Sequence, residues 1–192
     1  MKNIIVVTGG AGFIGSNLIK YLITKTKYKI ISIDNYSTGK KSNHIKTKRV
    51  KYFNCENKDI SKALKKYKNK ILTVFHFGEF SRIYMSFKFI DQCYNSNMLG
   101  TFNVVKFCSE NNVRIIYSAS SSKFGNDGKD EHLSPYSWSK SKNIEFIKNF
   151  SKWYNLKYEI LYFYNVYGNN HIKNNKMAAV IGIFESQFIK RK

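Results

Sequence analysis

The stretch TGGAGFIG, residues 8–15, directly follows an apolar run and opens a segment with helical periodicity. In this setting Gly9 permits a tight turn, Gly12 lets an anion approach bare backbone, and Gly15 lets the helix pack closely on the strand. Amide N–H groups at the start of the helix then point at the anion. Glycines at this spacing also form ordinary tight turns, but the strand before and the helix after favour a turn that binds a pyrophosphate.

Segments rich in Ile, Val, Phe and Tyr recur along the chain and alternate with segments of helical periodicity. Such alternation is typical of a parallel sheet covered by helices on both faces. The sequence therefore predicts an α/β fold with a doubly wound parallel sheet, and no run of 18 apolar residues is present to span a membrane. The expected strands are 4–8, 29–34, 50–53, 71–77, 113–118 and 158–164, and the expected helices are 13–25, 60–67, 90–111 and 136–154.

The charge of the chain is strongly positive, with 33 Lys and Arg against 12 Asp and Glu and a net charge of +21. Only four of these cations are Arg, the residue that suits phosphate and base recognition best, and the lysines are scattered among 21 Asn. We interpret the excess as a compositional bias and expect no nucleic acid as partner, although a basic nucleic-acid binder stays a third hypothesis. The positive field should attract small anionic ligands.

The cysteines and histidines give no metal-binding or disulfide pattern. Cys55, Cys93 and Cys108 are odd in number and contain no Cys-x-x-Cys pair, and the four histidines lie far apart in the sequence. Neither a disulfide framework nor a metal site is expected. A reducing, cytoplasmic environment fits this pattern.

Asp34 ends the second expected strand, 34 − 15 = 19 residues after Gly15. A carboxylate at this distance is placed to accept hydrogen bonds from the adenosine ribose of a dinucleotide. A 2′-phosphate there would meet a like charge, which favours NAD over NADP, although Lys40 and Lys41 weaken the discrimination. The alternative is a turn aspartate in the polar segment 34–39.

Tyr136 and Lys140 stand four residues apart on an expected helix, so the phenol and the ammonium share one face. The spacing alone proves little, because about two such pairs are expected by chance from this composition and the chain has four. Context selects this pair, since the helix follows the serine-rich end of the fifth strand and ligands lie outside the carboxyl ends of parallel strands. Ser120 and Tyr136 should then converge beside a nicotinamide. The alternatives are a turn-forming Ser120 and a packed Tyr136 after Pro135.

These motifs, in this order, resemble those of the extended short-chain dehydrogenase/reductase family of nucleotide-sugar enzymes. The chain looks most like the NAD-dependent UDP-glucose 4-epimerases and their sugar-epimerase relatives, and the resemblance spans residues 3 to about 168. It implies NAD as cofactor and a UDP-linked sugar as substrate. The cofactor-binding residues that it implies are Gly9, Gly12, Phe13, Ile14 and Gly15 at the pyrophosphate, Asp34, Asn35, Ser37, Thr38 and Glu56 at the adenosine, and Phe77, Gly78, Asn97, Tyr136, Lys140 and Phe163 elsewhere.

The resemblance also implies a mechanism, with Ser120, Tyr136 and Lys140 as catalytic residues. Lys140 stabilises the phenolate of Tyr136 and bonds the nicotinamide ribose, and Tyr136 takes a proton from the sugar while hydride leaves C4 for NAD. The keto-sugar turns over and regains hydride on its other face, with Ser120, Tyr136 and Asn165 contacting the substrate. Related dehydratases carry Asp-Glu where this chain has Ser121-Ser122, which favours epimerisation over dehydration, and net oxidation or reduction stays open as an alternative.

Two departures from the family pattern affect these expectations. Glu79 follows Gly78 where relatives have a pair of small residues, which places a charge near the nicotinamide end. The chain is also shorter than its relatives, so we expect residues 1–168 to form the NAD-binding domain and 169–192, with an amphipathic segment at 178–189, to begin a substrate-binding lobe. A non-catalytic NAD-binding fragment is therefore the second hypothesis. The helices 90–111 and 136–154 pair two subunits in many relatives, so a homodimer is possible by similarity.

Overall fold

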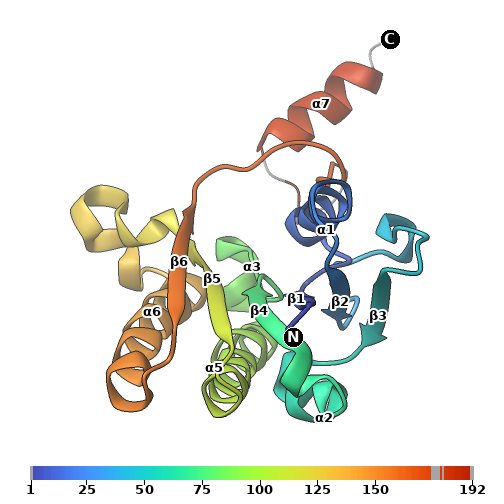
Figure 1. Ribbon diagram of the computed structural model, residues 1–192. Helices are drawn as coiled ribbons and strands as arrows, with labels where there is room; N and C mark the ends of the chain where they lie inside the picture. Colours follow the sequence, from blue (N-terminus) through green and yellow to red (C-terminus); the bar gives the residue numbers. More distant parts are fainter. Residues whose placement is uncertain (1, 174–177, 179, 191–192) are drawn as a thin grey trace.

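The computed structural model describes residues 2–173, 178 and 180–190. Its centre is a six-stranded parallel sheet with strand order β3-β2-β1-β4-β5-β6, so the predicted doubly wound sheet is confirmed (Figure 1). The expected strands are all present, with ends shifted by two residues at most. They are β1 (Ile4–Thr8), β2 (Lys29–Asp34), β3 (Val50–Asn54), β4 (Ile71–His76), β5 (Arg114–Ser120) and β6 (Tyr158–Phe163).

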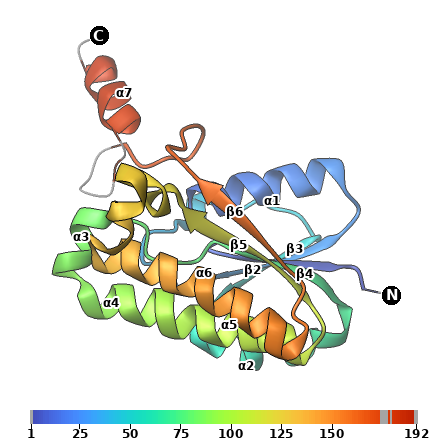
Figure 2. The same ribbon diagram turned by 90° about the vertical axis from the view of Figure 1, so that its left-hand side faces the viewer.

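Helices cover both faces of the sheet (Figure 2). On one face α1 (Phe13–Lys25) packs through Ile19 and Leu22 against the side chains of Ile5 and Val7 in β1. On the other face α2, α5 and α6 pack against a larger cluster that includes Val6 of β1. Because β1 is buried on both faces, its residues are apolar without the alternation of a half-exposed strand. The remaining bounds are α2 (Ile60–Leu64), α3 (Ile83–Lys88), α4 (Ile90–Tyr94), α5 (Gly100–Glu110), α6 (Pro135–Tyr154) and α7 (Val180–Lys190).

Two expected helices differ from prediction. The helix expected at 60–67 ends at Leu64, because the amide of Tyr67 bonds to the Leu64 carbonyl in a tighter three-residue turn. The helix expected at 90–111 is interrupted by a π-helical turn, Asn95–Leu99, between α4 and α5. Periodicity does not reveal this turn, which surrounds the buried Asn97; such π-turns occur frequently at functional sites.

Helix α6 begins as the sequence predicts, just before Tyr136. Pro135 occupies its first turn, and the Ser134 hydroxyl caps the helix by accepting a hydrogen bond from the Ser137 amide at 3.0 Å. The helix ends at Tyr154 and is followed by Asn155, whose φ of 53° is left-handed. The capped start fixes Tyr136 one residue into the helix, at the edge of the sheet where the strands end.

The strand order reverses between β1 and β4, whose neighbours lie on opposite sides of the sheet. The carboxyl ends of β1, β2, β4 and β5 therefore meet at one edge, the place where ligands bind in sheets of this kind. Helix α7 extends away from the sheet beyond this edge (Figures 1 and 2). None of the helices in the described part of the chain has the length and hydropathy needed to cross a bilayer.

Candidate active site

A cavity of about 1140 Å³ runs along this edge of the sheet. It is lined by the turn after β1, the loop after β2, the segments after β4, β5 and β6, and the start of α6. All of the predicted site residues except Asn97 line it. They are Gly9, Gly12, Phe13, Ile14, Gly15, Asp34, Asn35, Ser37, Thr38, Glu56, Phe77, Gly78, Ser120, Tyr136, Lys140, Phe163 and Asn165.

The glycines of the first turn have different surroundings. Gly9 has a φ of +68°, and a Cβ there would lie 2.8 Å from the Cα of Gly78. A Cβ on Gly15 would overlap the carbonyl oxygen of Gly9. A Cβ on Gly12 would meet only that oxygen, at 3.1 Å, and otherwise open space. The turn therefore presents bare backbone to the cavity at the N-terminus of α1, an arrangement that could hold a pyrophosphate.

Asp34 is held by backbone amides at the end of β2. Its Oδ2 accepts a hydrogen bond from the Ala11 N–H at 2.9 Å, and its Oδ1 accepts one from the Tyr36 N–H at 2.8 Å. Gly39 packs closely, since a Cβ there would lie 2.7 Å from Oδ1. Asp34 is thus the turn aspartate of the alternative interpretation and also a cavity-lining carboxylate, so the two roles coexist.

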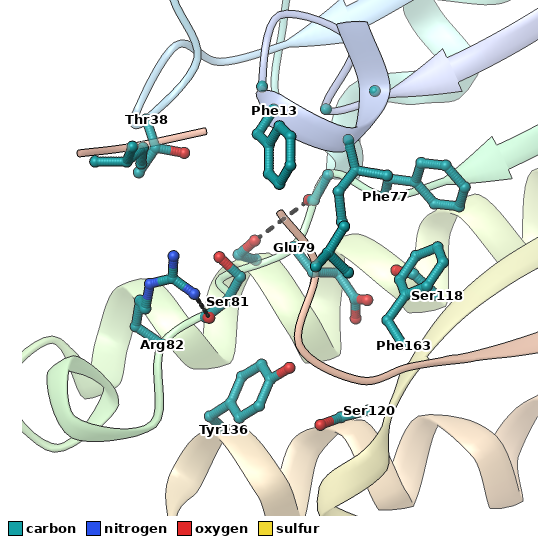
Figure 3. A pocket seen from close by; sticks show the side chains of 18 of the residues that line it. Phe13, Thr38, Phe77, Glu79, Ser81, Arg82, Ser118, Ser120, Tyr136 and Phe163 are labelled. Carbon is teal, nitrogen blue, oxygen red and sulfur yellow. Dashed lines mark hydrogen bonds between the residues drawn. The ribbon is translucent and has the colours of Figure 1, made fainter. Parts of the chain in front are cut away.

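Ser120 and Tyr136 converge, as expected from their places in the chain. Tyr136, from the start of α6, and Ser120, from the end of β5, both line the cavity, and Figure 3 shows the Ser120 hydroxyl turned toward the side on which Tyr136 lies. The Ser120 hydroxyl also accepts a hydrogen bond from the Ser122 amide at 3.2 Å. Such a pair can bind a substrate hydroxyl between two oxygens and transfer its proton.

Lys140 lies one turn along α6 from Tyr136 and is buried. Its Nζ donates to the Ser118 carbonyl oxygen at 2.6 Å and forms an ion pair with Oε2 of Glu79. The Glu79 side chain is only 1% exposed. The ammonium is therefore held between the end of β5 and a carboxylate from the segment after β4.

The other oxygen of Glu79 accepts three hydrogen bonds. The donors are the Thr101 hydroxyl at 2.9 Å, the Tyr117 hydroxyl at 3.1 Å and the Asn143 amide at 3.0 Å. Burial, followed by the charge of Glu79, raises the pKa of Tyr117 well above its ordinary value, so this phenol stays a donor. Glu79 is therefore a fully hydrogen-bonded buried carboxylate.

His76 extends this network to the glycine turn. Burial lowers the pKa of His76 to about 4, so the ring is neutral. Because Thr101 donates to Glu79, Nε2–H of His76 donates to Thr101 at 2.9 Å, and Nδ1 accepts from the Thr8 hydroxyl at 2.7 Å. The Thr8 oxygen in turn accepts the Gly78 amide at 3.0 Å. Hydrogen bonds thus connect Lys140 to the segment opposite Gly9.

Asn97 is buried behind the cavity rather than in its lining. Its Oδ1 accepts the Phe80 amide at 2.7 Å, and its Nδ2 donates to the Ser139 hydroxyl at 3.0 Å. Its backbone oxygen accepts Nδ2 of Asn143 at 2.7 Å. Asn97 therefore joins the segment after β4 to α6 in the structure.

Sequence reasoning missed several cavity residues. Arg82 lines the cavity and lies across from Tyr136 (Figure 3). Burial lowers the pKa of its guanidinium, and a Tyr136 phenolate would raise it. Asn57 donates to the Gly78 carbonyl, and Asn170 donates to the Ser16 hydroxyl at 3.1 Å near the start of α1. The position of Arg82 shortly after the end of β4 could have indicated from the sequence that it lines the cavity. No sequence signal indicated this for Asn170.

The described residues include no group of three or more His, Cys, Asp or Glu side chains arranged to hold a metal ion. The site instead combines a glycine turn, an acidic residue after β2 and a Ser–Tyr–Lys set in one cavity of a doubly wound sheet. These features define a protein of the extended short-chain dehydrogenase/reductase class.

Comparison with known proteins specifies the class further. The chain belongs to the NAD dependent epimerase/dehydratase family, whose model matches residues 5–191. It is 32% identical to a Methanocaldococcus jannaschii protein named "Putative UDP-glucose 4-epimerase", over 97% of this chain and 63% of that protein.

Solved structures of epimerases are similar in fold to this chain. The UDP-glucose 4-epimerase of Thermotoga maritima, solved with UDP-glucose, has a TM-score of 0.88 at 25% identity, covering 97% of this chain and 63% of that one. The UDP-N-acetylglucosamine 4-epimerase of Methanobrevibacter ruminantium, in complex with UDP-N-acetylmuramic acid, has a TM-score of 0.87 at 29% identity. The match covers 100% of this chain and 64% of that one. The chain thus spans just under two thirds of the length of these relatives.

Proposed function

We propose that this chain forms the NAD-binding and catalytic part of a nucleotide-sugar 4-epimerase of the UDP-glucose 4-epimerase type. The observation that supports the proposal most directly is that Gly12 of the glycine turn lines the same cavity as Ser120 and Tyr136. Family membership and the names of the similar epimerases support it. Residues 1–168 are the proposed NAD-binding domain, and 169–192 the start of the substrate-binding lobe.

The residues that line the cavity are suited to bind NAD. Bare backbone at Gly12 leaves room for a pyrophosphate at the start of α1, and the carboxylate of Asp34, held by the Ala11 amide, would bind the adenosine ribose. A carboxylate in that place opposes the phosphate of NADP. NAD bound in this cavity supplies a hydride acceptor that later gives the hydride back. The other cavity-lining residues of the proposed cofactor site are Gly9, Phe13, Ile14, Gly15, Asn35, Ser37, Thr38, Glu56, Phe77, Gly78, Tyr136, Lys140 and Phe163. Asn97 lies behind the lining and would act on the cofactor only through the segment after β4.

Tyr136 performs the proton transfer in this proposal. Its phenolate accepts the proton of the sugar C4 hydroxyl, Ser120 shares the hydrogen bond to that oxygen, and the C4–H bond breaks with loss of hydride to give a ketone. When the ketone has turned over and regained hydride on its other face, Tyr136 returns the proton. The configuration at C4 is inverted without net oxidation.

The substrate end supports epimerisation rather than dehydration. Ser121 and Ser122 line the cavity beside Ser120 and offer no carboxylate to expel water from the sugar. Asn165, which also lines the cavity, is proposed to bind the UDP-linked substrate.

We also propose a homodimer formed by α5 and α6. Large apolar side chains stand exposed on these helices, among them Phe102, which is 44% exposed, and Trp153, which is 65% exposed. Exposed apolar patches of this kind mark protein–protein contacts.

The test is turnover of UDP-glucose and of UDP-N-acetylglucosamine by the purified chain, with the products separated by chromatography. Formation of the C4 epimer with NAD retained supports the proposal, and Tyr136→Phe should abolish it. Tyr84→Phe, an exposed tyrosine on α3, is the matched control and should leave turnover unchanged. Normal turnover by Tyr136→Phe would show that the base is assigned wrongly.

A further inference from the structure

Glu79 is a buried carboxylate that the proposed mechanism does not use. It lies on the segment after β4, beside the cavity that holds Ser120 and Tyr136 (Figure 3). Its side chain is 1% exposed and forms an ion pair with Lys140. A buried carboxylate is costly unless a cation and hydrogen-bond donors compensate it, and Lys140 is the cation that compensates Glu79.

Lys140 supplies the positive charge that balances Glu79. The three donors to the other carboxylate oxygen, Thr101, Tyr117 and Asn143, are uncharged. His76, the next member of the network, is neutral because burial lowers its pKa to about 4. The Glu79–Lys140 pair therefore contributes no net charge to this end of the cavity.

We propose that Glu79 is a positioning residue that anchors Lys140 and cancels its charge, so that the reacting end of the cavity favours the oxidised, cationic nicotinamide over the reduced, neutral one. This inference rests on the proposed NAD site. Glu79 and the Ser118 carbonyl take two of the three N–H donors of the ammonium, and the third, with Nζ now 3.4 Å from the Ser118 hydroxyl, is left to bond a ribose. The repulsion between the ammonium and the ring cation is offset by Glu79.

Loss of either charge of the Glu79–Lys140 pair should change the relative affinities for NAD⁺ and NADH in a defined direction. NAD⁺ and NADH differ by one unit charge at the nicotinamide, so a change in local protein charge acts on the ratio of their dissociation constants. One uncompensated charge within several ångströms should change that ratio by at least about fivefold at the effective dielectric constant of a protein site. A defect in folding or packing lowers both affinities together and leaves the ratio unchanged.

The experiment measures the dissociation constants of NAD⁺ and NADH at pH 8 by calorimetric titration of the purified chain. Glu79→Gln leaves Lys140 uncompensated, so Kd(NAD⁺)/Kd(NADH) should rise at least about fivefold. Lys140→Met leaves Glu79 uncompensated, so the ratio should fall. The double variant restores neutrality and should return the ratio to that of the unmodified chain. Glu79→Asp keeps the charge and should also keep the ratio.

Glu145→Gln is the matched control, because Glu145 lies on the same helix as Lys140 but is exposed and pairs with Lys142. It should change neither constant. If Glu79→Gln fails to fold, Lys140→Met is compared with the double variant instead. Kd(NAD⁺)/Kd(NADH) must then be lower in Lys140→Met than in the double variant.

An unchanged ratio in both single variants would overturn the inference, even if epimerisation is intact. Conversely, the expected ratios in a chain that epimerises no nucleotide sugar would contradict the proposed function and leave the role of Glu79 standing.

Discussion

The carboxylate of Asp34 accepts a hydrogen bond from the backbone N–H of Ala11 at 2.9 Å, which joins the end of β2 to the glycine turn after β1. The same side chain is only 7% exposed and accepts the Tyr36 amide. One residue thus shapes the turn and presents negative charge to the cavity.

Asp34→Asn should weaken NAD binding and reduce the preference for NAD over NADP. The amide keeps one acceptor oxygen but loses the charge that opposes a 2′-phosphate, so we expect NAD affinity to fall about tenfold and the affinity for NADP to fall less or rise. Titration with both dinucleotides measures the effect. Asp91→Asn, at an exposed position on α4, should change neither affinity. An unaltered NAD/NADP ratio in Asp34→Asn would contradict this assignment.

Gly12→Ala and Gly15→Ala should have different effects, although both add one methyl group. At Gly15 the methyl overlaps the Gly9 carbonyl, so we expect a loss of about 1–3 kcal/mol in the free energy of unfolding. At Gly12 the methyl meets little protein, so the fold should persist while NAD binding is lost. Urea denaturation and NAD titration separate the two outcomes, and a stable Gly15→Ala would contradict the close packing.

Stability should fall as the pH decreases from about 6.5 to about 4, because of His76. Burial holds the pKa of His76 in the folded state at about 4, below the ordinary histidine value of 6.5, so the unfolded chain binds the extra proton throughout this window. The contribution lost amounts to about 3 kcal/mol. His76→Gln should flatten the pH dependence of unfolding by urea, whereas His132→Gln, at an exposed position, should not. Equal slopes in His76→Gln and the unmodified chain would refute the assignment.

Trp153→Glu should prevent the proposed dimer. The indole is 65% exposed on α6, and a charge there opposes burial against a second copy of the apolar face. Size-exclusion chromatography with light scattering at micromolar concentration should show a dimer for the unmodified chain and a monomer for the variant. Tyr21→Glu, at an exposed position on the opposite face of the sheet, is the control. A monomeric unmodified chain would contradict the proposal.

The sequence predicted most of the strands because their residues are apolar on both faces, a pattern that burial between two helical layers requires. It predicted the start of α6 because Pro135 and the Ser134 cap are local signals. It did not predict the π-helical turn around Asn97, since that turn accompanies contacts with Phe80 and Ser139 that are distant in sequence.

The sequence by itself determined the doubly wound fold and the positions of the glycine turn, Asp34, Ser120 and Tyr136, because periodicity and strand-end placement are local properties. Only the tertiary structure decided that Glu79 pairs with Lys140. These two residues are brought together by the adjacency of β4 and β5 and by the packing of α6 against the sheet. Which cation pairs with a buried carboxylate depends on the distance between the two groups and on their burial. Neither quantity can be read from the order of residues along the chain.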